Sequence, residues 1–173
     1  MTKPEPVTVT TPTDRQIVLT RSFDAPCQPV FDALTRPELL IRWFGARGWN
    51  LVVCEVDLRV GGAWRFVSRG PDGTEMGHGG VYRVILPPGR LGYTERYDDQ
   101  SYPGETLISH ELVERDNRTT LTSTVQYATP QGRDRVLRYP MQRGVSESYH
   151  RLSELLAELL DRPTGTLEGR RTS

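Results

Sequence analysis

Apolar side chains near the C-terminal end of the chain recur at the three- and four-residue spacing of an amphipathic helix. Pro140 suits the first turn of this helix, and Asp161-Arg162-Pro163 ends it because proline cannot continue helical hydrogen bonding. The pattern predicts one helix of about five turns with a single apolar face. The residues on that face are Met141, Val145, Tyr149, Leu152, Leu155, Leu156 and Leu159.

A different period, in which apolar and polar residues alternate, covers most of the chain before this helix. Ile17 to Phe23 alternates in this way, and further β-rich runs follow from Leu51 onward. The turns between these runs are rich in glycine, proline, asparagine and aspartate, so the runs predict an antiparallel meander. The six later strands are predicted at Leu51–Leu58, Ala63–Ser68, Gly80–Leu86, Leu91–Tyr97, Thr106–Glu114 and Thr119–Tyr127.

Two short helices are predicted between the first strand and the second. Pro29 stands in the first turn of one helix, and Pro37 to Phe44 forms the other. One strand, two helices, six strands and a long helix cannot form alternating βαβ units, so the sequence predicts an α+β fold. A seven-stranded antiparallel sheet buries one amphipathic helix by curling around it. We therefore expect an internal cavity between the sheet and the helix, suited to a small ligand.

The length of 173 residues suits one domain. We place this domain at residues 17–160. Residues 1–16 are rich in threonine and proline and predict a flexible N-terminal arm, and residues 161–173 predict a flexible C-terminal tail.

Charge and hydropathy exclude several kinds of partner. The 22 Lys and Arg balance the 22 Asp and Glu, so we expect no binding to nucleic acid or to an anionic membrane surface. No apolar run approaches the roughly 20 residues that span a bilayer, and residues 1–16 lack the apolar core of a signal peptide. We expect a cytoplasmic protein, either a monomer or a homodimer.

Neither a metal nor another cofactor is expected. Cys27 and Cys54 lack metal-ligand spacing, and the three histidines form no His-x-x-x-His pair. The glycine pairs do not lead from a strand into a helix, as a phosphate-binding loop requires. His78 stands between glycines, and we expect it at a loop or strand edge without a chemical role. His150 is expected to face solvent.

Strand alternation places a set of side chains on the concave face, toward the long helix. His110 is the candidate for acid–base chemistry, because apolar neighbours flank it and imidazole titrates near neutral pH. Glu95 is its candidate partner or a solvated charge. A hydrogen-bonded structural histidine and ordinary aromatic core packing are the alternatives. The predicted cavity residues are Trp43, Trp49, Trp64, Phe66, Tyr82, Tyr93, Glu95, His110, Leu112, Ser123, Met141, Val145 and Tyr149.

Several segments taken together carry a family resemblance: SFDAPCQPVFDALTRPELLIRWFG (22–45), VDLRVGG (56–62), PDGTE (71–75), GGVYRVILPPGRLGYT (79–94) and the final helix around Gly144. They resemble the START-like or SRPBCC superfamily, and more closely small bacterial proteins related to the C-terminal domain of the Hsp90 ATPase activator. The resemblance covers about residues 17–160 and implies the helix-grip (START/Bet v-like) fold. Many relatives carry Gly-Trp where this chain has Gly144-Val145, so we expect a larger cavity beside Val145.

Three functions remain open at this point, because a fold does not determine its chemistry. The first is binding of a small hydrophobic or aromatic ligand, such as a lipid- or polyketide-like metabolite, in the cavity. The second is a reaction like that of a polyketide cyclase or aromatase, with His110 as the acid or base. The third is the role of an interaction protein similar to a chaperone-ATPase activator.

Overall fold

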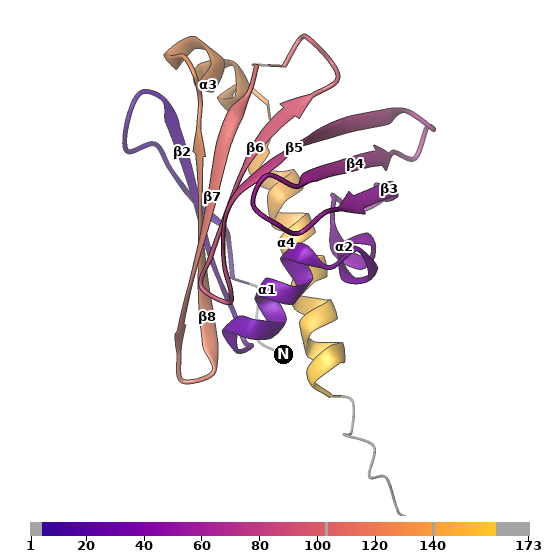
Figure 1. Ribbon diagram of the computed structural model, residues 1–173, viewed down its shortest axis with the longest axis vertical. Coiled ribbons are helices and arrows are strands. Elements are labelled where there is room, and N and C mark those ends of the chain that lie inside the picture. Colours follow the sequence, from indigo (N-terminus) through magenta and orange to yellow (C-terminus); the bar gives the residue numbers. More distant parts are fainter. Residues whose placement is uncertain (1–4, 103, 140, 162–173) are drawn as a thin grey trace, which may run out of the picture.

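The protein folds as one sheet that curves around a single long helix (Figure 1). The computed structural model describes residues 5–102, 104–139 and 141–161. The sheet is antiparallel, with strand order β1-β2-β8-β7-β6-β5-β4-β3. The predicted α+β class with a long C-terminal helix is confirmed.

The strands are β1 (Thr8–Thr10), β2 (Gln16–Phe23), β3 (Asn50–Val56), β4 (Ala63–Arg69), β5 (Glu75–Leu86), β6 (Arg90–Tyr97), β7 (Thr106–Arg115) and β8 (Arg118–Gln126). The helices are α1 (Cys27–Thr35), α2 (Pro37–Trp43), α3 (Pro130–Leu137) and α4 (Met141–Leu160).

The predicted count of seven strands is wrong because β1 adds an eighth at one edge of the sheet. Thr8 lies opposite Thr20 of β2, and Val7 just before β1 is buried in the core. Part of the segment predicted as a flexible arm is therefore built into the sheet. Prolines on both sides of the Val-Thr alternation hid this strand, although an edge strand tolerates proline at its ends.

Helix α4 lies along the concave side of the sheet, with α1 and α2 beside it (Figure 1). Its buried residues include Leu152, Leu155 and Leu156, which lie on the predicted apolar face. These side chains join the hydrophobic core together with Phe23 and Trp43. Hydrophobic burial along α4 therefore fixes how the sheet wraps around the helix.

Strand β5 begins at Glu75, five residues before the start predicted from the sequence. His78 consequently lies within the strand and is only 4 % exposed, so its predicted place at a loop or strand edge is wrong. The indole of Trp64 crosses β5 at Gly80 and donates from Nε1 to the carbonyl oxygen of Thr94 on β6, at 3.1 Å. A Cβ on Gly80 would collide with that oxygen, so glycine here permits close approach and does not mark a loop.

Helix α3 lies between β8 and α4 in the chain and is capped by Thr129, whose side chain accepts a hydrogen bond from the amide of Gly132. Pro140, predicted to open the long helix, lies outside the described residues. The same is true of residues 162–173 in the predicted C-terminal tail. Within the described ranges, no helix combines the length and apolar character needed to cross a membrane.

Candidate functional site

A row of polar side chains crosses the inner face of the sheet and reaches α4. Nε2 of His110 lies 2.8 Å from the hydroxyl oxygen of Tyr93, and its Nδ1 lies 2.7 Å from Oγ of Ser123. Oγ of Ser123 lies 3.4 Å from the hydroxyl oxygen of Tyr149 on α4. Three adjacent strands and the helix therefore share one hydrogen-bonded chain, and both ring nitrogens of His110 are occupied.

Burial keeps this row neutral at physiological pH. Desolvation lowers the pKa of His110 from 6.5 to about 4, and it raises the pKa of Tyr93 well above 10. The pKa of Tyr149 is raised by the same cause. A neutral imidazole with two hydrogen bonds is a weak proton acceptor, so the geometry favours the structural alternative for His110 over the acid–base role.

Glu95 pairs with His78 and not with His110. Its Oε2 lies 3.0 Å from Nδ1 of His78, across the β5–β6 pair. The His78 side chain is 5 % exposed and that of Glu95 is 15 % exposed. The predicted partnership between Glu95 and His110 is therefore wrong. Choosing the partner of Glu95 required the register of β5 against β6.

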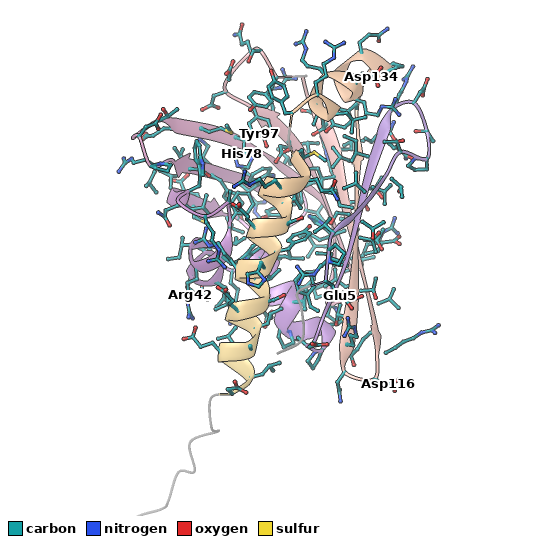
Figure 2. The ribbon with its side chains drawn as sticks, turned by 180° about the vertical axis from the view of Figure 1, so that it is seen from behind. Glu5, Arg42, His78, Tyr97, Asp116 and Asp134 are labelled. Atoms are coloured by element: carbon teal, nitrogen blue, oxygen red, sulfur yellow. The ribbon has the colours of Figure 1, made fainter. Side chains whose placement is uncertain are left out.

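The imidazole of His78 lies within a column of stacked rings. Its centroid is 4.9 Å from that of Tyr97 at an interplanar angle of 10°, and 5.8 Å from that of Phe44 at 28°. Tyr102 stacks on the far side of Tyr97, at 4.6 Å. Trp64 approaches His78 edge-on, at 5.3 Å. These rings hold the imidazole plane in one orientation (Figure 2 shows His78 and Tyr97 beside the N-terminal turns of α4).

Several polar atoms around Glu95 have no described partner. No described residue bonds Nε2 of His78 or the hydroxyls of Tyr97 and Tyr127, and none of these atoms is sealed from solvent. Desolvation, followed by the nearby charge of Glu95, raises the pKa of Tyr127 to about 12 and that of Tyr97 well above 10. We call His78, Glu95, Tyr97 and Tyr127 the open polar cluster.

Arg21 adds a buried cation on the inner face, at β2. One of its terminal nitrogens donates to Oγ of Ser153 on α4 at 3.0 Å, and its guanidinium lies 5.0 Å from the ring centre of Phe23. Its Nε is sealed without a partner among the described residues, and desolvation lowers its pKa. The inner face therefore carries a positive charge in addition to its neutral polar groups.

The remaining predicted cavity residues lie on or beside the inner face. The indole nitrogen of Trp43 donates to the carbonyl of Ala33 at 2.9 Å, so the polar atom of this side chain already has a partner within the fold. The segment with Trp49 is attached to α4, because Arg151 donates to the carbonyls of Gly45 and Trp49 at 3.0 Å each. Buried members of the predicted set are Trp64, Phe66, Tyr82 and Leu112, and partly buried members that pack on the core are Met141 and Val145.

Two hollows are prominent at the surface. The larger, about 630 Å³, opens over β4–β6 where Gly79 separates the outward-facing Arg65 and Arg96, and Trp64 and Tyr97 also line it. The smaller, about 240 Å³, lies between α3 and the loop before β7. Neither hollow is lined by a residue of α4, so the cavity between sheet and helix stays a prediction.

The described residues contain no group of three His, Cys, Asp or Glu side chains placed to hold a metal ion. Cys27 is buried, and desolvation raises the pKa of the partly buried Cys54 to about 11, which keeps that thiol protonated.

Alternation along β5 was the signal that could have identified His78. Met76, His78, Gly80 and Tyr82 share one parity, so an earlier start of the strand places His78 on the inner face. The stacking of Phe44 and Tyr97 on His78 could not be predicted, because it depends on contacts between segments far apart in the sequence.

Comparison with known proteins places this chain among a set of bacterial relatives. Residues 24–157 match the family model described as Activator of Hsp90 ATPase homolog 1-like protein. A crystal structure of a protein from Rhodobacter sphaeroides is 34 % identical, with a TM-score of 0.84 over 89 % of this chain and 99 % of that one. A protein from Nitrosomonas europaea is 25 % identical, with a TM-score of 0.78 over 88 % of this chain and 100 % of the other.

An AHSA1 protein from Silicibacter pomeroyi shares the fold at 20 % identity, with a TM-score of 0.70 over 83 % of this chain and 99 % of that one. No curated protein matches the chain.

Proposed function

The chain belongs to the Activator of Hsp90 ATPase homolog 1-like family, and on this premise we propose that it binds a small hydrophobic or aromatic ligand between the sheet and the N-terminal half of α4. The observation that carries the proposal is the open polar cluster. Nε2 of His78 and the hydroxyls of Tyr97 and Tyr127 have no described partner and are not sealed from solvent, so a ligand can reach them. A ligand at this position would satisfy them.

The rest of the inner face has fewer unused hydrogen-bonding groups and more tightly packed side chains. The row through His110 satisfies its own hydrogen bonds, and Leu152 and Leu156 of α4 are almost completely buried. Near the start of α4, by contrast, Met141 and Val145 are only partly buried. Binding in the first half of α4 therefore needs the least rearrangement of packed side chains.

The chemistry of the surroundings suggests the class of ligand. Stacked rings favour a planar aromatic or unsaturated group, because aromatic side chains contribute offset-stacked and edge-to-face contacts. The open imidazole nitrogen and the two phenol hydroxyls favour a carbonyl or hydroxyl on that group. The carboxylate of Glu95 disfavours an anionic group beside it. A neutral aromatic ketone or phenol fits these requirements.

Thermal unfolding in the presence of 2-tetralone or 2-naphthol tests the proposal. A ligand at about one hundred times its Kd stabilises the folded state by about 2.7 kcal/mol, which raises Tm by roughly 5–10 °C in a chain of this size. Unchanged Tm with both compounds at millimolar concentration contradicts the proposal.

Val145→Trp tests the location of the ligand. We expect this larger side chain to weaken binding of 2-tetralone by about tenfold or more, because it enters the space beside the start of α4. Leu160→Trp is the matched control: it makes the same replacement type on the same helix, at a position 47 % exposed. Equal affinity in the Val145→Trp variant and the wild type would place the ligand elsewhere.

A further inference from the structure

His78 and Glu95 have the arrangement of a general base and the carboxylate that positions it. We propose that His78 removes a proton from a carbon atom next to the carbonyl group of a bound aromatic ketone, with Glu95 as the positioning residue. The proposal rests on the binding site described above and adds a reaction to it.

The two ring nitrogens of His78 differ in a way that suits proton abstraction. The carboxylate of Glu95 accepts a hydrogen bond from Nδ1, 3.0 Å away, so Nδ1 carries the proton in the neutral ring. The lone pair is then on Nε2, which no described residue bonds and which is not sealed from solvent. In His110 both nitrogens are occupied, at 2.8 Å and 2.7 Å. Of the two inner histidines, only His78 has a free acceptor.

The ring column prevents the imidazole from turning away from its partner. Tyr97 and Phe44 cover its two faces, and Trp64 and Phe66 meet it edge-on at 5.3 Å and 5.7 Å. A base that is held in one orientation before the substrate binds loses little freedom when the reaction occurs.

Hydroxyl donors for the developing oxyanion stand next to the base. Tyr97 stacks directly on His78, and Tyr97 and Tyr127 both lie within the electrostatic reach of Glu95. Burial keeps both phenols protonated, so either can donate a hydrogen bond to an oxygen that becomes negative. Neither hydroxyl has a described partner that would compete for it.

The step balances without an oxidant, a reductant or a metal. The C–H bond breaks and its proton forms a new N–H bond at Nε2 of His78. The C–H electron pair becomes the carbon–carbon π bond of the enolate, and the carbonyl π pair moves to oxygen, which accepts a hydrogen bond from a tyrosine. The imidazolium exchanges its proton with solvent and returns a proton to carbon.

Deuterium exchange into 2-tetralone in D2O, followed by proton NMR, measures this step directly. We expect the wild-type protein to accelerate exchange about 100-fold or more over buffer, the range that a positioned general base supplies. His78→Gln should remove the acceleration, whereas His150→Gln should keep it, because His150 lies on α4 and pairs with Glu154.

Two conservative variants separate chemistry from folding and from binding. Tyr97→Phe keeps the ring that stacks on His78 and should slow exchange about tenfold or more. Glu95→Gln should slow exchange by a similar factor while the Kd for 2-tetralone changes less than threefold. A loss of affinity equal to the loss of rate would give Glu95 a binding role alone and would overturn its positioning role.

Binding and exchange measured together distinguish the two proposals. Binding of 2-tetralone with exchange no faster than in buffer overturns the proton transfer and leaves the binding site. Wild-type exchange rates in a folded His78→Gln variant overturn the role of His78. Absence of both binding and exchange contradicts both proposals.

Discussion

The inner face contains two histidines whose surroundings give them different properties. His110 is bonded through both nitrogens to neutral hydroxyl groups, and burial lowers its pKa to about 4. His78 is bonded through one nitrogen to a carboxylate, and its other nitrogen has no partner among the residues that the structure describes. The first arrangement connects three strands to α4, and the second presents an acceptor. Their different hydrogen-bond partners therefore suggest different tasks for the same residue type.

The neutral state of His110 predicts a specific loss of stability in acid. An unfolded histidine takes up a proton near pH 6.5, whereas His110 in the folded chain takes one up near pH 4. Between these values the unfolded chain binds more protons, so the free energy of unfolding falls as the pH is lowered through this window. The difference in pKa corresponds to about 3 kcal/mol.

Urea denaturation at several pH values from 7 to 4 checks this prediction. His110→Gln should be less stable than the wild type at pH 7, and its stability should fall by about 3 kcal/mol less between pH 6.5 and pH 4. The wild-type pH slope in the His110→Gln variant would contradict the neutral buried state.

At the level of single elements, a glycine in strand β5 and a glycine in helix α4 differ in whether their surroundings leave room for a side chain. Gly80 in β5 allows the indole of Trp64 to reach β6, and a Cβ there would collide with the carbonyl of Thr94. Gly144 in α4 shows no such crowding, because a Cβ there would meet no atom of the described residues within 4 Å. Close approach therefore explains the first glycine and not the second.

Alanine substitutions at these two positions should change the stability of the protein in opposite directions. Gly80→Ala should destabilise the protein by about 2 kcal/mol or more, because a backbone contact between β5 and β6 must open. Gly144→Ala should stabilise it by about 0.5–1 kcal/mol, since alanine is the better helix former and has room. Chemical denaturation of both variants measures the difference. A Gly80→Ala variant as stable as the wild type would contradict the tight crossing of Trp64.

At the scale of the whole molecule, the sequence predicted the architecture better than the candidate site. The period of the stripe from Met141 to Leu159 and the alternation of the strands identified α4 and seven of the eight strands, because those patterns are local. The partner of Glu95 depended on where β5 begins and on its register against β6. From sequence alone, the stretch from Gly77 to Gly80 resembles a loop. Its pairing with the neighbouring strands β4 and β6 identifies it as part of β5.

The whole molecule offers two places where a ligand could bind. The hollow of about 630 Å³ opens next to the outward-facing Arg65 and Arg96 and is bordered by Tyr97, whereas His78 of the open polar cluster is buried beneath it and is not among its lining residues. The outer hollow is the larger opening, but Arg65 and Asp98 already form an ion pair there, at 2.5 Å. The inner cluster contains the unpaired groups, and we therefore place the ligand on that side.

An NMR titration of the isotope-labelled protein with 2-tetralone most directly tests whether the ligand binds between the sheet and the start of α4. The account predicts that the signals of His78, Tyr127 and Val145, which do not line the outer hollow, shift in proportion to the bound fraction, while those of Gly79 and Arg96 in that hollow change little. Shifts confined to Gly79 and Arg96, or no shifts at saturating 2-tetralone, would contradict a ligand site between the sheet and the start of α4.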